Sequence, residues 1–359
     1  MTAQPLRILV VDDSAFSRRS ITRMLEGMSN VEVVGYAGDG EEGIRQVISL
    51  KPDLVTLDLE MPRMDGFTLL RILTGRFNLP VIVVSALAEA DKVFKALELG
   101  ALDFVAKPTS DASSELLLIR DDLQAKVNQA RSARIREVGL VEPKASVHKP
   151  APVRAGQRRQ QVDLVAIAAS TGGPPALQGI FNAFEASYPF ALVVAQHMPP
   201  GFTRAFAERL NKNSAFEVRE AQDGDIIRPG CALIAPGGSN LLLEQDGAAI
   251  RARITSPEGY RYIPSADALF ESCAPLYGRR MLAAILTGMG NDGSKGAQAV
   301  KARGGKVLAE SEESSVVYGM PREAVATGCV DRVVPLAEMP AAILKLGGFQ
   351  TNNTQHETR

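Results

Sequence analysis

The chain has 359 residues, of which 45% are hydrophobic, and this is enough for two domains that each bury a core of their own. The 40 Lys and Arg residues almost balance the 41 Asp and Glu residues, so the net charge of −1 does not favour binding to nucleic acid or to an anionic membrane. No run reaches the roughly 18 apolar residues that a membrane-spanning helix needs. The three cysteines, Cys231, Cys273 and Cys329, lack the paired spacing of a metal site. We therefore expect a cytoplasmic protein without membrane insertion.

Four short apolar runs in the first third of the chain alternate with helical patterns and predict a parallel sheet built from βαβ units. The runs cover residues 8–11, 54–57, 81–84 and 101–106. Polar residues stand at or just beyond their ends: Asp12, Asp13, Asp58, Ser85 and Lys107. Because the carboxyl ends of parallel strands open into one crevice, we expect these five side chains to converge.

The three carboxylates of this set would repel one another unless a cation lay among them. Oxygen ligands favour Mg²⁺, which can also carry a phosphoryl group to an Asp oxygen. The Ser85 hydroxyl and the Lys107 ammonium would then contact the phosphate. A single acid at a strand end could instead cap a helix, as we expect of Ser14 and Asp39. The complete set predicts a phosphorylation site.

The sequences around these residues resemble the receiver domain of bacterial response regulators. The matching stretches are residues 10–14 (VVDDS), residues 58–66 (DLEMPRMDG) and Lys107-Pro108. The resemblance implies a flavodoxin-like fold in which a histidine kinase phosphorylates Asp58. It also implies that Asp13, Asp58 and the backbone carbonyl of Glu60 hold Mg²⁺, while Asp12 completes the acidic pocket. Phe104 stands where the family has an aromatic switch residue.

A change of composition separates residues 1–130 from the rest of the chain. Residues 131–161 contain eight Lys or Arg, two Glu and three Pro, with little apolar periodicity. This composition predicts a basic, flexible linker, and a solvated tether is favoured over a nucleic-acid contact. The linker leads to a second domain at residues 162–346, and a polar tail at 347–359 is expected to be disordered.

The second domain again alternates apolar runs with amphipathic stretches, which predicts a second doubly wound parallel sheet of Rossmann-like form. The runs cover residues 164–168, 191–195, 232–235, 282–286 and 307–309, and helices are expected near 201–210 and 294–303. Turn sequences such as Asp246-Gly247 predict a small antiparallel excursion. The chain is thus expected to be an α/β protein of two doubly wound domains.

Three runs of the second domain end beside a hydroxyl, an imidazole and a carboxylate, those of Ser170, His197 and Asp292. The other two histidines fall in the predicted linker and tail, so only His197 is left in this domain to act as a base. A serine becomes a nucleophile when an imidazole takes its proton and a carboxylate orients that imidazole. Glycines after Ser170 and the Gly288-Met289-Gly290 turn could direct backbone amides toward an oxyanion.

Each of these elements also has a simpler interpretation. The Ser-Thr-Gly-Gly sequence could hold a phosphate at a helix N-terminus, His197 could be a core histidine, and Asp292 could be a turn residue. The joint placement at strand ends favours the catalytic interpretation. The sequences of a P-loop and of a Gly-x-Ser-x-Gly elbow are missing, which disfavours a P-loop nucleotide site and an ordinary α/β-hydrolase.

The same residues lie in motifs that resemble the CheB family of chemotaxis methylesterases. The motifs are residues 169–173 (ASTGG), 197–203 (HMPPGFT), 286–293 (LTGMGNDG) and 318–324 (YGMPREA). The resemblance implies hydrolysis of glutamate γ-methyl esters on chemoreceptors, with Ser170 as the nucleophile, His197 as the general base and Asp292 as its orienting acid. Backbone amides of Thr171 and Met289 would form the oxyanion hole. No cofactor is expected for the ester hydrolysis.

The expected activity is therefore a phosphorylation-activated methylesterase with methylated chemoreceptors as substrate and a histidine kinase as phosphodonor. Some members of the family also deamidate glutamine, and for this chain that activity stays open. The alternative is a receiver-controlled module that binds a phosphate or a partner without catalysis; a nucleic-acid output is a more distant third. One departure concerns Tyr262 and Ile263, which precede the PSAD sequence of residues 264–267, where the family often has basic residues.

Overall fold

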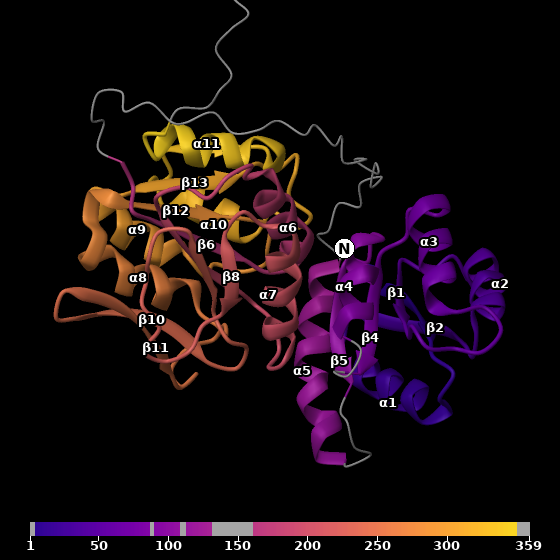
Figure 1. The fold of residues 1–359 in the computed structure, drawn as a ribbon. Coiled ribbons are helices and arrows are strands. Elements are labelled where there is room, and N and C mark those ends of the chain that lie inside the picture. The colour runs from indigo at the N-terminus through magenta and orange to yellow at the C-terminus, as the bar shows by residue number, and fades with distance from the viewer. Residues whose placement is uncertain (1–3, 87–89, 108–112, 131–160, 350–359) are drawn as a thin grey trace, which may run out of the picture. The chain divides into compact units, whose positions relative to one another are not determined.

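The structure, a computed structural model, describes residues 4–86, 90–107, 113–130 and 161–349, and the chain divides into two compact units between Val141 and Glu142 (Figure 1). Nearly all of the predicted linker, residues 131–160, and most of the predicted tail, residues 350–359, lie outside the described residues. Among the helices of the described ranges, none is both long enough and apolar enough to cross a membrane.

The first unit is a five-stranded parallel sheet in the order β2-β1-β3-β4-β5 (Figure 1). Its strands are β1 (Leu6–Val11), β2 (Val31–Ala37), β3 (Leu54–Leu57), β4 (Val81–Ala86) and β5 (Asp103–Lys107). Its helices are α1 (Ala15–Glu26), α2 (Gly40–Leu50), α3 (Gly66–Arg76), α4 (Ala90–Glu98) and α5 (Ser113–Ala130). This strand order is that of flavodoxin-like sheets, so the predicted fold of this unit is confirmed.

Helix caps and buried strands of this unit follow from the local sequence. The Ser14 and Asp39 side chains cap α1 and α2 as predicted, because each accepts a hydrogen bond from a backbone amide of the first turn. Strands β1, β3 and β4 are almost wholly apolar and buried, as expected of strands covered on both faces. Strand β2 is not among the predicted runs: it lies at the sheet edge, and only Ala37 of its residues is buried.

The second unit has a seven-stranded parallel sheet in the order β14-β13-β12-β6-β7-β9-β8. Its strands are β6 (Leu164–Ala169), β7 (Ala191–Gln196), β8 (Glu217–Glu220), β9 (Cys231–Ile234), β12 (Met281–Ile285), β13 (Lys306–Glu310) and β14 (Arg332–Val334). The predicted second doubly wound sheet is therefore confirmed. Strands β8 and β14 are not among the predicted runs, since both are short edge strands with charged residues.

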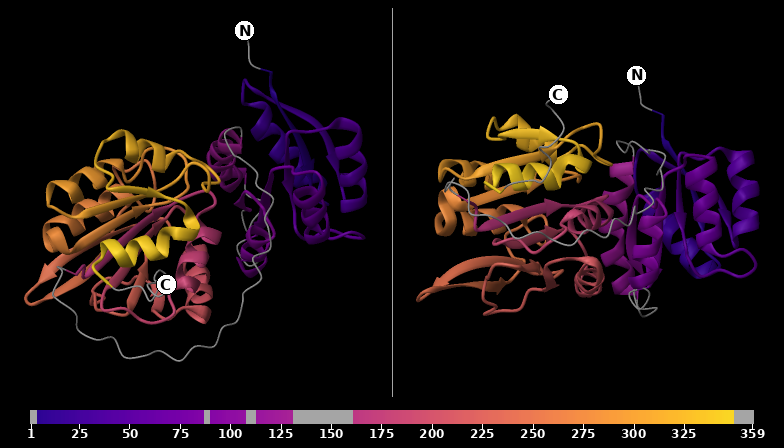
Figure 2. Two further views of the ribbon diagram at one scale, coloured as in Figure 1. Left: turned by 90° about the horizontal axis from the view of Figure 1, so that it is seen from above. Right: turned by 45° about the horizontal axis from the view of Figure 1, so that its top comes forward.

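Helices cover both faces of this sheet, as the two views of Figure 2 show. They are α6 (Gly173–Ala183), α7 (Phe202–Asn213), α8 (Ala266–Tyr277), α9 (Ser294–Ala302), α10 (Met320–Ala326) and α11 (Met339–Leu346), with the short 3₁₀ helices η2 (Gly278–Arg280) and η3 (Leu336–Glu338). Helices α8, α9 and α10 pack in sequence beside one another, and α6 packs with α7 and α11.

The predicted antiparallel excursion is a separate two-stranded sheet of β10 (Asn240–Asp246) and β11 (Ala249–Thr255), turning at Gly247. It packs against α8, and its Leu241, Leu243 and Ala252 join the core of the unit.

The end of the described chain is packed rather than free. The Val162 amide donates to the Gly347 carbonyl at 3.0 Å, and the Phe349 ring lies 5.3 Å from the Phe190 ring. The packed part of the chain thus extends three residues into the segment that the sequence assigned to the tail, because the Phe349 ring packs against the rings of Tyr188 and Phe190.

Candidate active site

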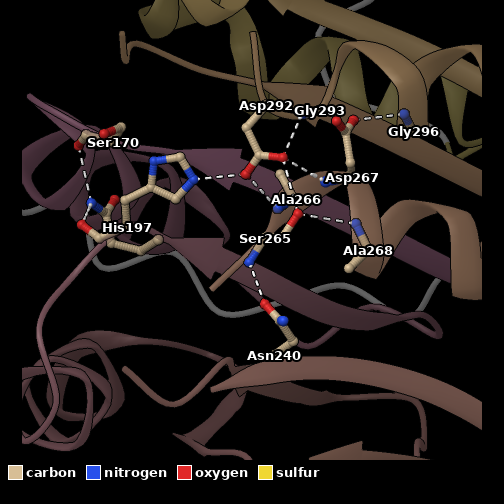
Figure 3. A network of polar contacts seen from close by, with 11 residues as sticks. Ser170, His197, Asn240, Ser265, Ala266, Asp267, Ala268, Asp292, Gly293 and Gly296 are labelled. Carbon is tan, nitrogen blue, oxygen red and sulfur yellow. Dashed lines mark hydrogen bonds and ion pairs between the residues drawn. The ribbon is translucent and has the colours of Figure 1, made fainter. Parts of the chain in front are cut away.

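The three candidate residues of the second unit lie at neighbouring strand ends. Ser170 follows β6, His197 follows β7, and Asp292 stands in the loop from β12 to α9, while β6 pairs with both β7 and β12. His197 Nε2 and Asp292 Oδ2 are 2.8 Å apart. Figure 3 shows the second ring nitrogen on the side of Ser170. An ionised Asp292 requires the proton on Nε2, which leaves the Nδ1 lone pair facing the serine.

Asp292 is 3% exposed, and its carboxylate lies against the first turn of α8 (Figure 3). Its Oδ2 also accepts from the Ala266 amide at 2.7 Å. Its Oδ1 accepts from Ser265 Oγ at 3.1 Å and from two more backbone amides, those of Asp267 and Gly293. Burial by itself raises the pKa of Asp292, but the His197 hydrogen bond and these amides outweigh it and lower the pKa. The carboxylate is therefore ionised at neutral pH.

Ser265 is a residue that sequence reasoning missed. Its side chain caps α8 by accepting from the Ala268 amide at 3.2 Å, and its own amide donates to Asn240 Oδ1 at 2.7 Å. Asn240 is fully buried at the start of β10. The serine that follows Pro264 carried a helix-cap signal, but its hydrogen bond to Asp292 depends on the folded chain.

Gln196 joins the turns that carry Ser170 and His197. Its Nε2 donates to the Ser170 carbonyl and to the His197 carbonyl, each at 3.0 Å, and the residue is 2% exposed. A Cβ on Gly173 would lie 2.0 Å from Gln196 Oε1, so only glycine fits at the start of α6. One amide group thus fixes the spacing between the two candidate catalytic residues.

The Gly288-Met289-Gly290 turn lies beside Ser170. An added Cβ on Gly288 would be 2.6 Å from the Ser170 Cβ, so the two residues touch. The Gly288 carbonyl accepts from the Gly319 and Met320 amides at 3.1 and 2.7 Å, which holds the turn in place. Within the described part of the chain, the Met289 amide donates to no protein acceptor. Thr171 is 2% exposed, and its carbonyl accepts from Thr287 Oγ1 at 2.9 Å.

Glu310 is a second residue that sequence reasoning missed. It is fully buried at the end of β13, where Oε2 accepts from the Thr287 amide at 2.8 Å and Oε1 from Ser314 Oγ at 2.9 Å. No cation pairs with it among the described residues. Burial raises the pKa of Glu310, and the two hydrogen bonds only partly oppose this.

Glu310→Gln is therefore expected to stabilise the protein at alkaline pH. Because the folded-state pKa of Glu310 lies above the ordinary 4.5, the contribution of Glu310 to stability is greatest below pH 4.5 and is lost as the pH rises through the folded-state pKa. Glutamine can accept from Thr287 while Ser314 reverses its hydroxyl. Thermal unfolding should show a gain of about 1–2 kcal/mol near pH 8 and almost none near pH 4. A gain that is the same at both pH values would contradict this explanation.

The acidic residues of the first unit form a compact cluster at the strand ends. Ligand oxygens of Asp12, Asp13 and Asp58 lie within 4.8 Å of one another. Lys107 Nζ is 2.7 Å from Asp12 Oδ2 and 2.7 Å from Asp58 Oδ2. Burial raises the pKa of Asp58 to about 6, although Lys107 opposes the shift. Three carboxylates with a single ammonium leave excess negative charge on oxygen donors, so the residues fit a hard divalent cation.

The remaining predicted residues of the first unit lie nearby or within its core. Glu60 and Asp13 line an open pocket of about 550 Å³, and the Glu60 side chain pairs with Lys92 at its rim. Ser85 is fully buried at the end of β4. Phe104 on β5 is 2% exposed, and Lys126 Nζ lies 4.9 Å from the centroid of its ring.

Comparisons with known proteins agree with both halves of this description. A family model described as CheB methylesterase matches residues 165–343, and one described as response regulator receiver domain matches residues 8–117. A protein-glutamate methylesterase/protein-glutamine glutaminase of Geobacter sulfurreducens is 53% identical over 366 residues, which cover 96% of this chain and 98% of that protein. A protein of the same name from Myxococcus xanthus is 44% identical, and the alignment covers 95% of this chain and 97% of that protein.

The solved structures include a crystal structure of the Thermotoga maritima CheB methylesterase catalytic domain. It is 39% identical, has a TM-score of 0.50, and covers 52% of this chain and 98% of that domain. Sequence and structure therefore agree that the chain belongs to the CheB methylesterase family and carries a response regulator receiver domain.

Proposed function

We propose that this protein hydrolyses γ-methyl esters of glutamate on methylated chemoreceptors and releases methanol. The observation that carries the proposal is the 2.8 Å contact of His197 Nε2 with Asp292 Oδ2, with the second ring nitrogen on the side of Ser170 (Figure 3). A hydroxyl, an imidazole and a buried carboxylate in this order make an activated nucleophile. The names of the relatives, protein-glutamate methylesterases, support the choice of ester.

In the first half of the reaction, His197 takes the Ser170 proton at Nδ1 while Ser170 Oγ attacks the ester carbonyl carbon. The tetrahedral intermediate then breaks its bond to the methoxy group, which leaves as methanol with the proton from His197. In the second half, His197 takes a proton from water while the water oxygen attacks the carbonyl carbon of the acyl-serine. The bond to Ser170 Oγ then breaks, Oγ regains its proton from His197, and the receptor keeps a glutamate γ-carboxylic acid that ionises. These steps use no cofactor.

The Asp292 carboxylate and two backbone amides would stabilise the transition states of both halves. Asp292 keeps the His197 proton on Nε2 and stabilises the imidazolium that forms when His197 accepts a second proton. The backbone amides of Met289 and Thr171 would donate to the oxyanion of each tetrahedral intermediate. The Met289 amide suits this role, since it has no acceptor within the described residues.

The receiver domain would regulate this reaction. Asp58 would accept phosphate from a histidine kinase, and Lys107 and Ser85 would contact the phosphoryl group. Phe104 would be the aromatic switch residue that responds to phosphorylation. Mg²⁺, held by Asp13, Asp58 and the Glu60 carbonyl with Asp12 beside them, would supply positive charge to the phosphoryl oxygens. This phosphodonor and the free thiols of the three cysteines are consistent with a cytoplasmic location.

The same site could deamidate glutamine. The relatives' names pair methylesterase with protein-glutamine glutaminase. Deamidation would pass through the same acyl-serine, with ammonia leaving in place of methanol and His197 supplying its proton. Ammonia release from receptor glutamine, assayed alongside methanol release, tests this second activity.

The regulation is tested by methanol release from methylated receptor with and without a small-molecule phosphodonor plus Mg²⁺, for the wild type and Asp58→Ala. We expect the phosphodonor to raise the wild-type rate, because it supplies the phosphate that Asp58 accepts, and to leave Asp58→Ala unchanged. Stimulation of both proteins would contradict the role of Asp58. If the wild type releases no methanol from any of several receptors, a receiver-controlled binding module becomes the better interpretation.

A further inference from the structure

An aromatic ring that the mechanism above does not use lies flat on the candidate general base. The rings of Tyr262 and His197 are nearly parallel, with an interplanar angle of 4° and centroids 5.2 Å apart. Tyr262 is half-buried, and the His197 side chain is 12% exposed. Such an offset stack covers one face of the imidazole and leaves its edge, with both nitrogens, open to other partners.

The hydroxyl end of the Tyr262 side chain contacts the Gly288-Met289-Gly290 turn. A Cβ added to Gly290 would lie 2.2 Å from Tyr262 Oη, and Gly290 has a φ of +90°. Only a glycine at position 290 leaves room for this phenol. Tyr262 therefore reaches from the imidazole of His197 to the proposed oxyanion turn, and its ring is confined at both ends.

The imidazole needs such a neighbour because one hydrogen bond does not fix a plane. The Nε2 contact with Asp292 holds one corner of the ring, but rotation about that contact would carry Nδ1 away from Ser170. A flat surface against the ring face removes this freedom, and a displacement of about 1 Å in a reacting group can cost about 100-fold in rate. The same π face attracts the imidazolium once His197 has taken a proton.

We propose that Tyr262 is a positioning residue, whose ring holds the His197 imidazole in the plane that joins Asp292 to Ser170 and stabilises its protonated form. The proposal rests on the proposed function, in which His197 is the general base. The aromatic ring carries the effect and the hydroxyl does not. Arg261, whose guanidinium lies 5.3 Å from the Tyr262 ring centroid, is an exposed neighbour outside this role.

The kinetic test uses the full-length protein with phosphodonor, Mg²⁺ and methylated receptor, and compares Tyr262→Phe with Tyr262→Leu. Phenylalanine keeps the ring, so kcat should stay within about threefold of the wild type, whereas leucine should lower kcat about 10- to 30-fold with KM changed less than about threefold. Tyr260→Leu is the matched control, since Tyr260 is 43% exposed two residues away, and it should keep the wild-type kcat. A wild-type kcat for Tyr262→Leu, or a change in its KM alone, overturns the proposal.

A spectroscopic readout separates positioning from a general loss of structure. The chain has only three histidines, so the ring protons of His197 can be followed by NMR after histidine labelling. A stacked phenol shifts protons of its neighbour upfield, so the wild type and Tyr262→Phe should share this shift and Tyr262→Leu should lose it. An unshifted His197 signal in the wild type overturns the proposal. Ser170→Ala tells the failures apart: if it stays active, the proposed function fails, and if it is inactive while Tyr262→Leu is unaffected, only the role of Tyr262 fails.

Discussion

Ser170→Ala is expected to lower kcat for methanol release by about 10³- to 10⁶-fold, because only substrate binding and the oxyanion donors would remain. The change removes a single oxygen and leaves the surrounding backbone intact. The Ser170 amide would still donate to the Thr287 carbonyl at 3.0 Å, and its carbonyl would still accept from Gln196 Nε2. The variant should therefore fold and bind methylated receptor like the wild type.

The measurement is methanol release at saturating receptor, together with thermal unfolding to verify the fold. Ser256→Ala is a suitable control, since Ser256 is an exposed serine of the same unit and lies outside the site. Its kcat should equal that of the wild type. A loss below about tenfold for Ser170→Ala would remove Ser170 as the nucleophile.

Asp292→Asn is expected to lower kcat by about 10²- to 10⁴-fold. Both carboxylate oxygens accept hydrogen bonds: Oδ2 from His197 and Ala266, and Oδ1 from Ser265 and from two further amides. An asparagine would point its NH₂ group at donors in either orientation. If that group faces His197, the imidazole must present a lone pair at Nε2 and a proton at Nδ1, which is the wrong tautomer for a base toward Ser170.

This variant should also be less stable, by about 1–3 kcal/mol, because amide donors of the α8 terminus lose an acceptor. The kinetic and thermal effects can be compared with those of Asp267→Asn. Asp267 is the neighbouring acid, and its Oδ1 accepts from the Gly296 amide at 2.8 Å, a bond that an asparagine oxygen can keep. Asp267→Asn should keep most of the wild-type kcat. Equal losses in the two variants would show that Asp292 has no special role in orienting His197.

The central strands were predictable from sequence because strands covered on both faces become continuous apolar runs. Strands β6, β7 and β12 each coincide with such a run to within one residue at either end. The edge strands β2, β8 and β14 carry charged or half-buried residues, and the apolar pattern fades where one side of a strand meets solvent. Apolar runs therefore revealed the central strands of both sheets and the edge strand β5, but missed the edge strands β2, β8 and β14.

The candidate catalytic residues were predictable because polar side chains at the ends of buried parallel strands meet in one place. Gln196 and Glu310 carried the same signal, since each is the last residue of its strand. A hydroxyl, an imidazole and a carboxylate suggest a reaction, however, whereas a glutamine or a lone glutamate does not. The contacts of Tyr262 and Ser265 gave no such signal, because they depend on how the chain returns to the sheet after β11.

That return path divides the second unit into a sheet that carries the candidate catalytic residues and a separate segment that supplies their supporting contacts. The segment between β9 and α8 adds no strand to the seven-stranded sheet, yet it brings Ser265 to Asp292 and Tyr262 to His197. Substitutions near the tip of the β10–β11 hairpin, whose residues 244–248 are exposed, would alter the surface of this segment while the seven-stranded sheet and its buried core stay the same. The outer half of this hairpin can thus change without moving Ser265 and Tyr262, the side chains that contact Asp292 and His197.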